Sequence, residues 1–364
     1  MSASADFAGL FATPAPWLRG TGPHADMVLS TRIRLARNLR DVPFTHRAKD
    51  EVLQEVIARV HGAVKAAPSL AGGLLLKMQE CSPIERQVLL ERHLVSNELC
   101  DGARPRAIYV AQDDRVSVMI NEEDHIRLQA LTPGFQLAEA WGLADAADDG
   151  LDASLEYAFA EDIGYLTACP TNAGTGLRAS VLIHLPALMM TGGIQPVLNS
   201  IAQIGLNIRG MYGEHSDYMG AMFQISNQTT LGRSERDSIE SLERVTRQVI
   251  ETEERARERM LRDARVETED HVWRAYGLLR YCRAIQSKEV INLCSKVRLG
   301  VVMGLEGLCS LRVLNELMVQ AQPAHLQQMS GREMNADERK LYRAQVVRER
   351  LAAAEREAGE NRSS

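Results

Sequence analysis

The period of the hydrophobic residues changes near residue 232, and this change constrains the fold more than any other feature of the sequence. Between residues 27 and about 226, short runs alternate apolar and polar residues between turn signals, as half-buried strands do. After residue 232, Ser234 with Asp237 resembles a capping box, and apolar residues then recur at helical spacing. The pattern predicts a sheet with helices against it, followed by an essentially all-helical region.

The strand signal is clearest at residues 28–35, where the two faces of the predicted strand differ in chemistry. One face would carry Leu29, Thr31, Ile33 and Leu35, and the other would carry Ser30, Arg32 and Arg34. Further strands are expected at 115–121, with Val116, Val118 and Ile120 on one face, and at 177–185.

The composition excludes several classes of protein. A chain of 364 residues with 45% hydrophobic residues can bury a sizeable core, as one large domain with an appendage or as two domains. A net charge of -6 gives no global reason to bind nucleic acid or an anionic membrane. The six cysteines are widely spread, with no C-x-x-C pair and no signal peptide, so we expect free thiols and a cytoplasmic location.

No standard phosphate-binding loop is present. The chain has no G-x-x-x-x-G-K-[ST] loop, and residues 174–176 (GTG) do not complete a G-x-G-x-x-G fingerprint. Arginines on rigid strands could hold phosphates instead, because the guanidinium fork pairs with two phosphate oxygens. Arg32 and Arg34 share one strand face, although each arginine taken singly is better explained as a solvated surface residue.

Three other segments are suggestive without being decisive. Residues 121–125 (NEEDH) place three acids after an apolar strand, where either an acidic turn or a functional site would explain them. Residues 169–176 (CPTNAGTG) form a loop whose backbone can approach a ligand closely, although a lone cysteine is usually a small core residue. Residues 209–214 (RGMYGE) read as a glycine-bent turn.

Taken together, these segments resemble the guanidino (phosphagen) kinases, and among them the protein-arginine kinases. The matching stretches follow the family's order: 30–38 (STRIRLARN), 121–127 (NEEDHIR), 169–181 (CPTNAGTGLRASV) and 209–214 (RGMYGE). The resemblance implies an α+β fold, with an antiparallel sheet flanked by helices and an all-helical C-terminal domain. It also implies ATP held largely by arginines, with Mg²⁺ on the phosphates and no metal ligands from the protein.

The resemblance also implies a division of the chain. Residues 1–26 would be an irregular lead-in whose Trp17 docks on the body, and residues 27–256 would be the guanidino-kinase catalytic domain. Residues 257–352 would form the helical domain for dimerisation and substrate handling, followed by a disordered tail at 353–364.

The resemblance assigns roles residue by residue. Glu123 would be the catalytic base, Glu214 would grip the substrate guanidinium from a second side, and Cys169 would help align it. His93 would lie near the nucleoside, although a structural role explains it equally well. The expected ATP-binding residues are Ser30, Thr31, Arg32, Ile33, Arg34, His93, Arg127, Arg178, Ala179, Ser180, Val181, Leu182, Arg209, Gly210, Met211, Tyr212, Gly213 and Glu214.

The position of the first motif bears on the substrate. Small-molecule members of the family carry a helical domain ahead of this motif, which here begins at Ser30, so we expect an open site and a protein substrate. The implied reaction is ATP-dependent phosphorylation of arginine side chains in proteins, as a mark for Clp-type degradation, by a homodimer that an activator protein assists. A kinase for free arginine or another guanidino compound, and a non-catalytic adaptor for a protease, remain as alternatives.

One motif departs from the family pattern. An Arg-Asp-x-x-Arg-Ala motif that binds phosphoarginine allosterically is matched here by Arg339, Arg343 and Ala344, but Lys340 replaces the acid. A lysine adds repulsion between the two arginines and removes a partner for the ligand's guanidinium. We therefore expect weak or absent activation by phosphoarginine.

Overall fold

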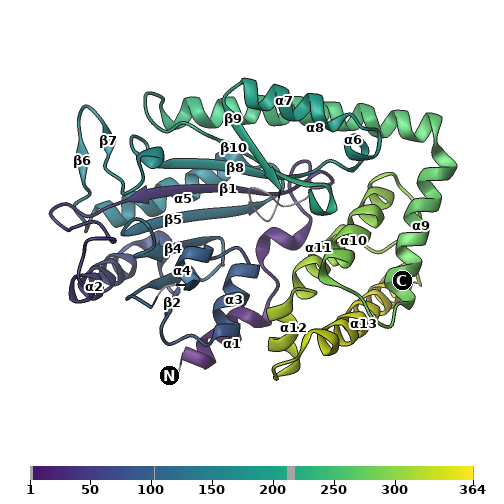
Figure 1. The fold of residues 1–364 in the computed structure, drawn as a ribbon, viewed down its shortest axis with the longest axis horizontal. Coiled ribbons are helices and arrows are strands. Elements are labelled where there is room, and N and C mark those ends of the chain that lie inside the picture. The colour runs from purple at the N-terminus through teal and green to yellow at the C-terminus, as the bar shows by residue number, and fades with distance from the viewer. Residues whose placement is uncertain (1–2, 102, 211–217, 364) are drawn as a thin grey trace.

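The computed structural model describes residues 3–101, 103–210 and 218–363, and its centre is an antiparallel sheet (Figure 1). The sheet has eight strands in the order β2-β3-β4-β5-β1-β8-β10-β9, and every neighbouring pair is antiparallel, which confirms the predicted fold class. The strands are β1 (Val28–Arg37), β2 (Leu74–Lys77), β3 (Ala107–Val110), β4 (Val116–Ile120), β5 (Ile126–Pro133), β8 (Leu177–His184), β9 (Leu206–Gly210) and β10 (Met222–Asn227).

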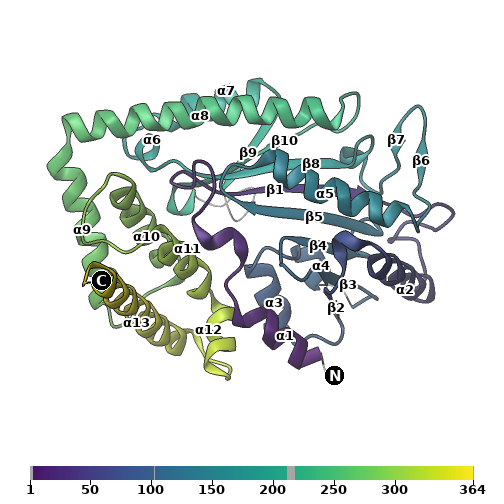
Figure 2. The same cartoon turned by 180° about the vertical axis from the view of Figure 1, so that it is seen from behind.

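One face of the sheet is apolar and is covered by helices. Helix α5 (Leu137–Asp152) packs on β1 and β5, as the view from behind shows, and α8 (Glu235–Asp263) packs on β8 and β10 (Figure 2). Ala140 and Ala144 of α5 are fully buried, and their small side chains let the helix lie close to the strands. Helices α2 (Asp50–Ala66), α6 (Pro186–Met190) and α7 (Ile194–Gln203) extend this layer.

A bulge in β1 corrects one sequence prediction. Val28 pairs with Ile183 and Ser30 with Leu182, so β1 carries one extra residue between these two pairs. Leu29 therefore does not share a face with Ile33 as predicted, and it packs in the same cluster as Leu182 on the opposite side of the sheet.

The region after the sheet is helical, as predicted. Helix α8 begins with Ser234, whose hydroxyl accepts a hydrogen bond from the Asp237 backbone N–H at 3.1 Å. The helices that follow are α9 (Arg265–Tyr281), α10 (Ser287–Val302), α11 (Leu311–Gln320), α12 (Pro323–Ser330) and α13 (Ala336–Ser363). Within the residues that the structure describes, none of the helices has the length and apolar character needed to traverse a bilayer.

Both ends of the chain are more regular than the sequence predicted. Helix α1 (Ala3–Ala12) occupies part of the expected irregular lead-in, and α13 runs through the expected disordered tail to Ser363. Trp17 does dock on the body, since it is 2% exposed and its indole donates a hydrogen bond to the Arg92 carbonyl at 3.3 Å. Helix α8 continues past residue 256, so the division of the chain into domains remains a prediction.

Buried arginines join elements that are distant in the sequence. Arg298 of α10 is fully buried and donates hydrogen bonds to the Asn315 side chain and to the Ala25 carbonyl, both at 2.6 Å. Arg37, at the end of β1, pairs with Asp148 of α5 at 2.7 Å, and its guanidinium lies 3.5 Å from the centre of the Tyr165 ring. These contacts fix the lead-in and the end of β1 against the helices.

Candidate active site

Five arginines lie on the face of the sheet opposite the apolar core, and we call this side the arginine face. It carries Arg32 and Arg34 on β1, Arg127 on β5, Arg178 on β8 and Arg209 on β9. Strand register places Arg34 directly beside Arg178. The alternation that buries Ile33 and Leu35 is therefore what gathers these cations.

The arginine face concentrates positive charge. Arg32 donates to Gln224 at 2.9 Å and to Ser180 at 3.4 Å, whereas no hydrogen bond or ion pair within the described part of the chain holds Arg34. Burial, together with Arg178 and Arg127, lowers the pKa of Arg32 to about 10. Burial and the same neighbours, with Arg32, lower the pKa of Arg34 well below its usual value. Since a guanidinium stays protonated, this charge is unfavourable until an anion binds.

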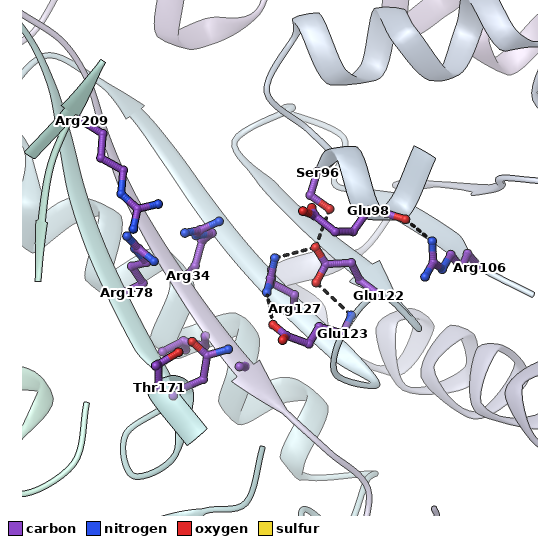
Figure 3. Close-up of a pocket in the computed structure, with 14 residues that line it drawn as sticks. Arg34, Ser96, Glu98, Arg106, Glu122, Glu123, Arg127, Thr171, Arg178 and Arg209 are labelled. Carbon is purple, nitrogen blue, oxygen red and sulfur yellow. Dashed lines mark hydrogen bonds and ion pairs between the residues drawn. The ribbon is translucent and has the colours of Figure 1, made fainter. Parts of the chain in front are cut away.

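Two carboxylates with different environments stand at one end of this face. The Glu122 side chain is 1% exposed and pairs with Arg127 at 2.6 Å, and it also accepts a hydrogen bond from the Ser96 hydroxyl. The Glu123 side chain is 42% exposed and lies 3.2 Å from the other end of the same guanidinium. Figure 3 shows Arg34, Arg178 and Arg209 in a row on one side and Arg127 with the two carboxylates on the other.

The environment of Glu123 suits proton transfer. Burial raises its pKa, and Asp124 and Glu122 add to this effect, while Arg127 opposes it. A carboxylate with a raised pKa is a stronger base, and its exposure leaves it accessible to a substrate. Glu122 is already occupied by Arg127 and Ser96, so it serves to hold Arg127 in place.

The cysteine loop approaches the same site. The Cys169 thiol lies 3.0 Å from the Thr171 hydroxyl, and Thr171 lines the cavity beside Glu123. Gly174 has φ 101°, and a Cβ there would lie 2.4 Å from the Thr230 carbonyl oxygen, so only glycine fits the tight path of the loop. The loop therefore has a fixed conformation against the sheet.

A buried aspartate ties this loop to the acidic turn. One oxygen of Asp124 accepts hydrogen bonds from the Ala168 backbone N–H at 2.6 Å and from the Asn38 side chain at 2.7 Å. Asp124 is fully buried. It is the residue after Glu123, and Ala168 is the residue before Cys169. The two predicted catalytic groups are thus held relative to each other through their neighbours.

Two cavities meet at the arginine face. The first, of about 480 Å³, extends from Arg34, Arg178 and Arg209 to Glu122 and Glu123. The second, of about 630 Å³, shares the same three arginines and extends the other way, to His93 and the helices beyond it. Volumes of this size suit small-molecule ligands, and the shared cations are the natural place for phosphates.

The structure sorts the predicted ATP-binding residues by strand face. The side chains of Thr31, Ile33, Ala179 and Val181 are buried on the core side, so these four residues present only their backbone to the arginine face, and their assignment to ATP binding stays a prediction. Ser30, Ser180 and Leu182 lie on the arginine side, where they line a small hollow next to Arg32 and His93. Gly210 lines the second cavity, and Met211, Tyr212, Gly213 and Glu214 lie outside the described residues.

His93 has both a structural and a site position. Its ring stacks on Trp17 with centroids 4.8 Å apart, and its backbone has φ 63°. It lines the second cavity, and burial, with the charge of Arg32, lowers its pKa to about 4. His93 is therefore neutral at physiological pH, and adds no charge to the arginine face.

Several site residues were not predicted. Glu122 pairs with Arg127, Gln224 accepts a hydrogen bond from Arg32, and Ser96 donates to Glu122, but only strand register and long-range packing bring these three residues to the site. Two signals in the sequence pointed toward them. Glu122 is adjacent to the predicted Glu123, and alternation along β10 places Gln224 on the same face as Ser226, which accepts a hydrogen bond from Arg178 at 3.4 Å. Finding these residues would have required knowing which strands are neighbours in the sheet.

The stretch that resembles a phosphoarginine motif lies in α13. Arg343 is buried and donates to the Ala321 carbonyl at 2.6 Å and to the Ile285 carbonyl at 3.0 Å, and Arg339 donates to the Met334 carbonyl at 2.6 Å. Lys340 pairs at the surface with Asp337, at 2.9 Å. Both arginines therefore stabilise the fold by donating hydrogen bonds to backbone carbonyl groups. Phosphoarginine binding at this stretch remains a prediction.

An antiparallel sheet whose polar face gathers five arginines, with a carboxylate at one end, is typical of phosphotransferases of the phosphagen-kinase class. Residues 55–256 match the model of the ATP:guanido phosphotransferase C-terminal catalytic domain, and residues 265–362 match that of the protein-arginine kinase McsB C-terminal domain. The chain belongs to the protein-arginine kinase family.

Relatives and solved structures agree with this assignment. The protein-arginine kinase of Moorella thermoacetica is 48% identical over 92% of this chain and 97% of its own length, and that of Bacillus subtilis is 46% identical over 92% and 93%. Among solved structures, lombricine kinase superposes with a TM-score of 0.57 at 26% identity, over 66% of this chain and 71% of that chain. The duplicated taurocyamine kinase of Schistosoma mansoni, with transition-state analogue components, superposes with a TM-score of 0.57 at 25% sequence identity, over 68% of this chain and 38% of that chain.

Proposed function

We propose that this chain transfers the γ-phosphoryl group of MgATP to arginine side chains of proteins. The observation that carries the proposal is the meeting of two cavities at Arg34, Arg178 and Arg209, with Glu123 at the far end of one of them. With the phosphates at the shared arginines, the nucleoside would occupy one cavity and the guanidinium the other, next to Glu123. The attacking nitrogen could then approach the γ-phosphorus from the side opposite the leaving ADP oxygen, as in-line phosphoryl transfer requires.

In the proposed reaction the arginine face neutralises the phosphates and Glu123 receives the proton. A nitrogen of the target arginine attacks the γ-phosphorus, so an N–P bond forms while the P–O bond to ADP breaks. The guanidinium, with a pKa above about 12, gives its proton to the Glu123 carboxylate. We propose that Glu214 and Cys169 orient the guanidinium during this step.

Mg²⁺ is proposed to arrive with the nucleotide. Among the described residues, no group of three or more His, Cys, Asp or Glu side chains could hold a metal ion. Phosphate oxygens and water are sufficient ligands for Mg²⁺ in many kinase sites. Arg32, Arg34 and Arg178 would share the neutralisation of the phosphates with the ion.

The relatives named above are protein-arginine kinases, which supports a protein substrate, whereas the two solved structures are kinases named for the small guanidino compounds lombricine and taurocyamine. The test is to incubate the purified chain with γ-labelled ATP and either an arginine-containing protein or free arginine. Acid-labile label on the protein supports the proposal. Transfer to free arginine alone would replace it with a small-molecule kinase.

We also propose a homodimer through the helical region. Helix α9 carries four exposed apolar or aromatic side chains, Val266, Trp273, Leu278 and Tyr281, and this number of exposed apolar residues on one helix supports an interaction surface there. Light scattering of the native chain and of Tyr281→Glu would test the dimer. A cytoplasmic location, an activator protein and the marking of targets for a Clp-type protease are further proposals, which rest on the family resemblance.

A further inference from the structure

The second cavity is walled partly by the C-terminal helical region. Its lining includes Leu90, His93 and Val95 from the segment around α3 (Pro83–Glu91). Another part of the lining comes from Val319, Gln322 and Pro323, at the junction of α11 and α12. These three residues fall within the stretch that matches the C-terminal family model, not the catalytic one.

The positions proposed for the phosphates and the guanidinium indicate which part of ATP this cavity would hold. The phosphates would lie at the shared Arg34, Arg178 and Arg209, and the substrate guanidinium at Glu123. The nucleoside must then extend away from Glu123, which leads into the second cavity. Leu90, Val95, Val319 and Pro323 offer apolar surface there, as a flat heteroaromatic base requires.

The junction is held in place from the catalytic side. The Glu91 carboxylate accepts hydrogen bonds from the backbone N–H groups of Ala324 at 2.9 Å and His325 at 3.0 Å, and it lies 2.6 Å from the His325 ring nitrogen Nδ1. These contacts satisfy free N–H groups in the first turn of α12 with an anion. Glu91 itself also lines the cavity.

The junction is also held from the C-terminal side. The Arg343 guanidinium donates to the Ala321 carbonyl, directly before Gln322, at 2.6 Å. The Gln322 side chain donates to the Met318 carbonyl at 2.8 Å and accepts from the Ser287 hydroxyl at 3.0 Å. A segment fixed on both sides presents a preformed surface, which loses little entropy when a ligand binds.

We propose that the α11–α12 junction forms one wall of the nucleoside pocket, so that Val319 and Pro323 of the C-terminal region contact the purine nucleoside of ATP. This inference rests on the proposed function, because it takes ATP as the nucleotide. It makes the helical region part of the nucleotide site in addition to its proposed role in dimerisation.

Two probes separate the nucleoside from the phosphates: MgATP and magnesium tripolyphosphate, which has the phosphates alone. Their affinities would be measured by calorimetry for the native chain, Pro323→Trp and Met329→Trp. Pro323→Trp places a large ring in the cavity, whereas Met329, 39% exposed in the same helix, does not line it. We expect Pro323→Trp to weaken MgATP binding roughly tenfold or more, with tripolyphosphate changed by less than about twofold.

The outcomes are distinct. Equal MgATP affinity in Pro323→Trp and the native chain would overturn the inference, as would an equal loss in Met329→Trp. If Pro323→Trp loses tripolyphosphate binding as well, the milder Pro323→Ala decides: a loss confined to MgATP supports the wall, and an unchanged affinity overturns it. A native chain that binds neither probe would instead refute the proposed function.

Discussion

Arg34 and Arg127 lie on the same face of the sheet, yet replacing each by methionine should change stability in opposite directions. Arg34 has no hydrogen bond or ion pair in the described part of the chain; burial, Arg32, Arg127 and Arg178 lower its pKa, and the attraction of Glu122 opposes them without reversing the shift. Removing this poorly compensated charge should stabilise the nucleotide-free protein by about 1–3 kcal/mol. Methionine keeps the length and the apolar contacts of the side chain.

Arg127→Met should have the opposite effect, because Glu122 depends on it. The Glu122 side chain is 1% exposed and pairs with Arg127 at 2.6 Å. Breaking a buried pair by removing one partner costs about 3–5 kcal/mol, because the remaining charge is left buried. Arg127→Met should therefore melt at a lower temperature than the native chain, while Arg34→Met should melt a few degrees higher.

Both variants should bind MgATP more weakly, since each loses a fixed cation on the arginine face. For Arg34→Met, the loss of a buried charged contact to phosphate corresponds to about 2–5 kcal/mol, or roughly 30-fold or more in affinity. Thermal unfolding without nucleotide and calorimetric titration with MgATP measure the two effects. A nucleotide-free Arg34→Met that is less stable than the native chain would refute the reasoning that this charge awaits an anion.

Four further predictions concern other parts of the chain. Since burial raises the pKa of Glu123, transfer should be lost as pH falls through a value above that of an ordinary glutamate, about 4.3. Glu123→Gln should melt normally and lose most transfer at every pH, and near-normal turnover would contradict its role as base. Arg178→Ala should weaken MgATP binding, whereas Cys169→Ser should leave binding nearly intact and slow transfer; equal losses of affinity would argue that the cysteine is structural. Calorimetry and kinase assays with free phosphoarginine should show weak or absent activation, and Lys340→Asp should strengthen it; tight binding with strong activation of the native chain would show the opposite. Burial, with the nearby arginines Arg298 and Arg257, lowers the pKa of His184, so this histidine takes up a proton more readily in the unfolded state than in the folded state. The melting temperature should therefore decrease as the pH is lowered through about 6.5, and it should decrease less steeply in His184→Gln. The same pH dependence in both proteins would exclude this histidine as the cause.

Strand alternation is a local property, and it was sufficient for three of the eight strands and for Arg32 and Arg34 of the arginine face, whereas Arg127, Arg178 and Arg209 were assigned from the family resemblance. The alternation of β1 placed Arg32 and Arg34 together, and that of β4 placed Val116, Val118 and Ile120 in the core. The bulge at Leu29 was not predictable, since it comes from pairing with β8 and leaves no local signature.

The acidic turn shows a second limit. Glu122, Glu123 and Asp124 are adjacent and chemically similar, yet one holds Arg127, one is exposed at the cavity and one binds the cysteine loop. Burial and partners distant in the sequence create these differences. The sequence therefore identified the acidic run as a candidate site but could not assign a separate role to each of its three acids. The same holds for His93, whose stacking partner Trp17 is distant in the chain.

The buried arginines have a consequence for an enzyme whose proposed substrate is arginine itself. Arg298, Arg37 and Arg343 hold the protein together through guanidinium hydrogen bonds, and all three are 4% exposed or less. Phosphorylation of such a group would remove donors and add negative charge where neither can be accommodated. Burial therefore shields the enzyme's own framework from self-modification, and limits autophosphorylation of the folded chain to arginines at its surface.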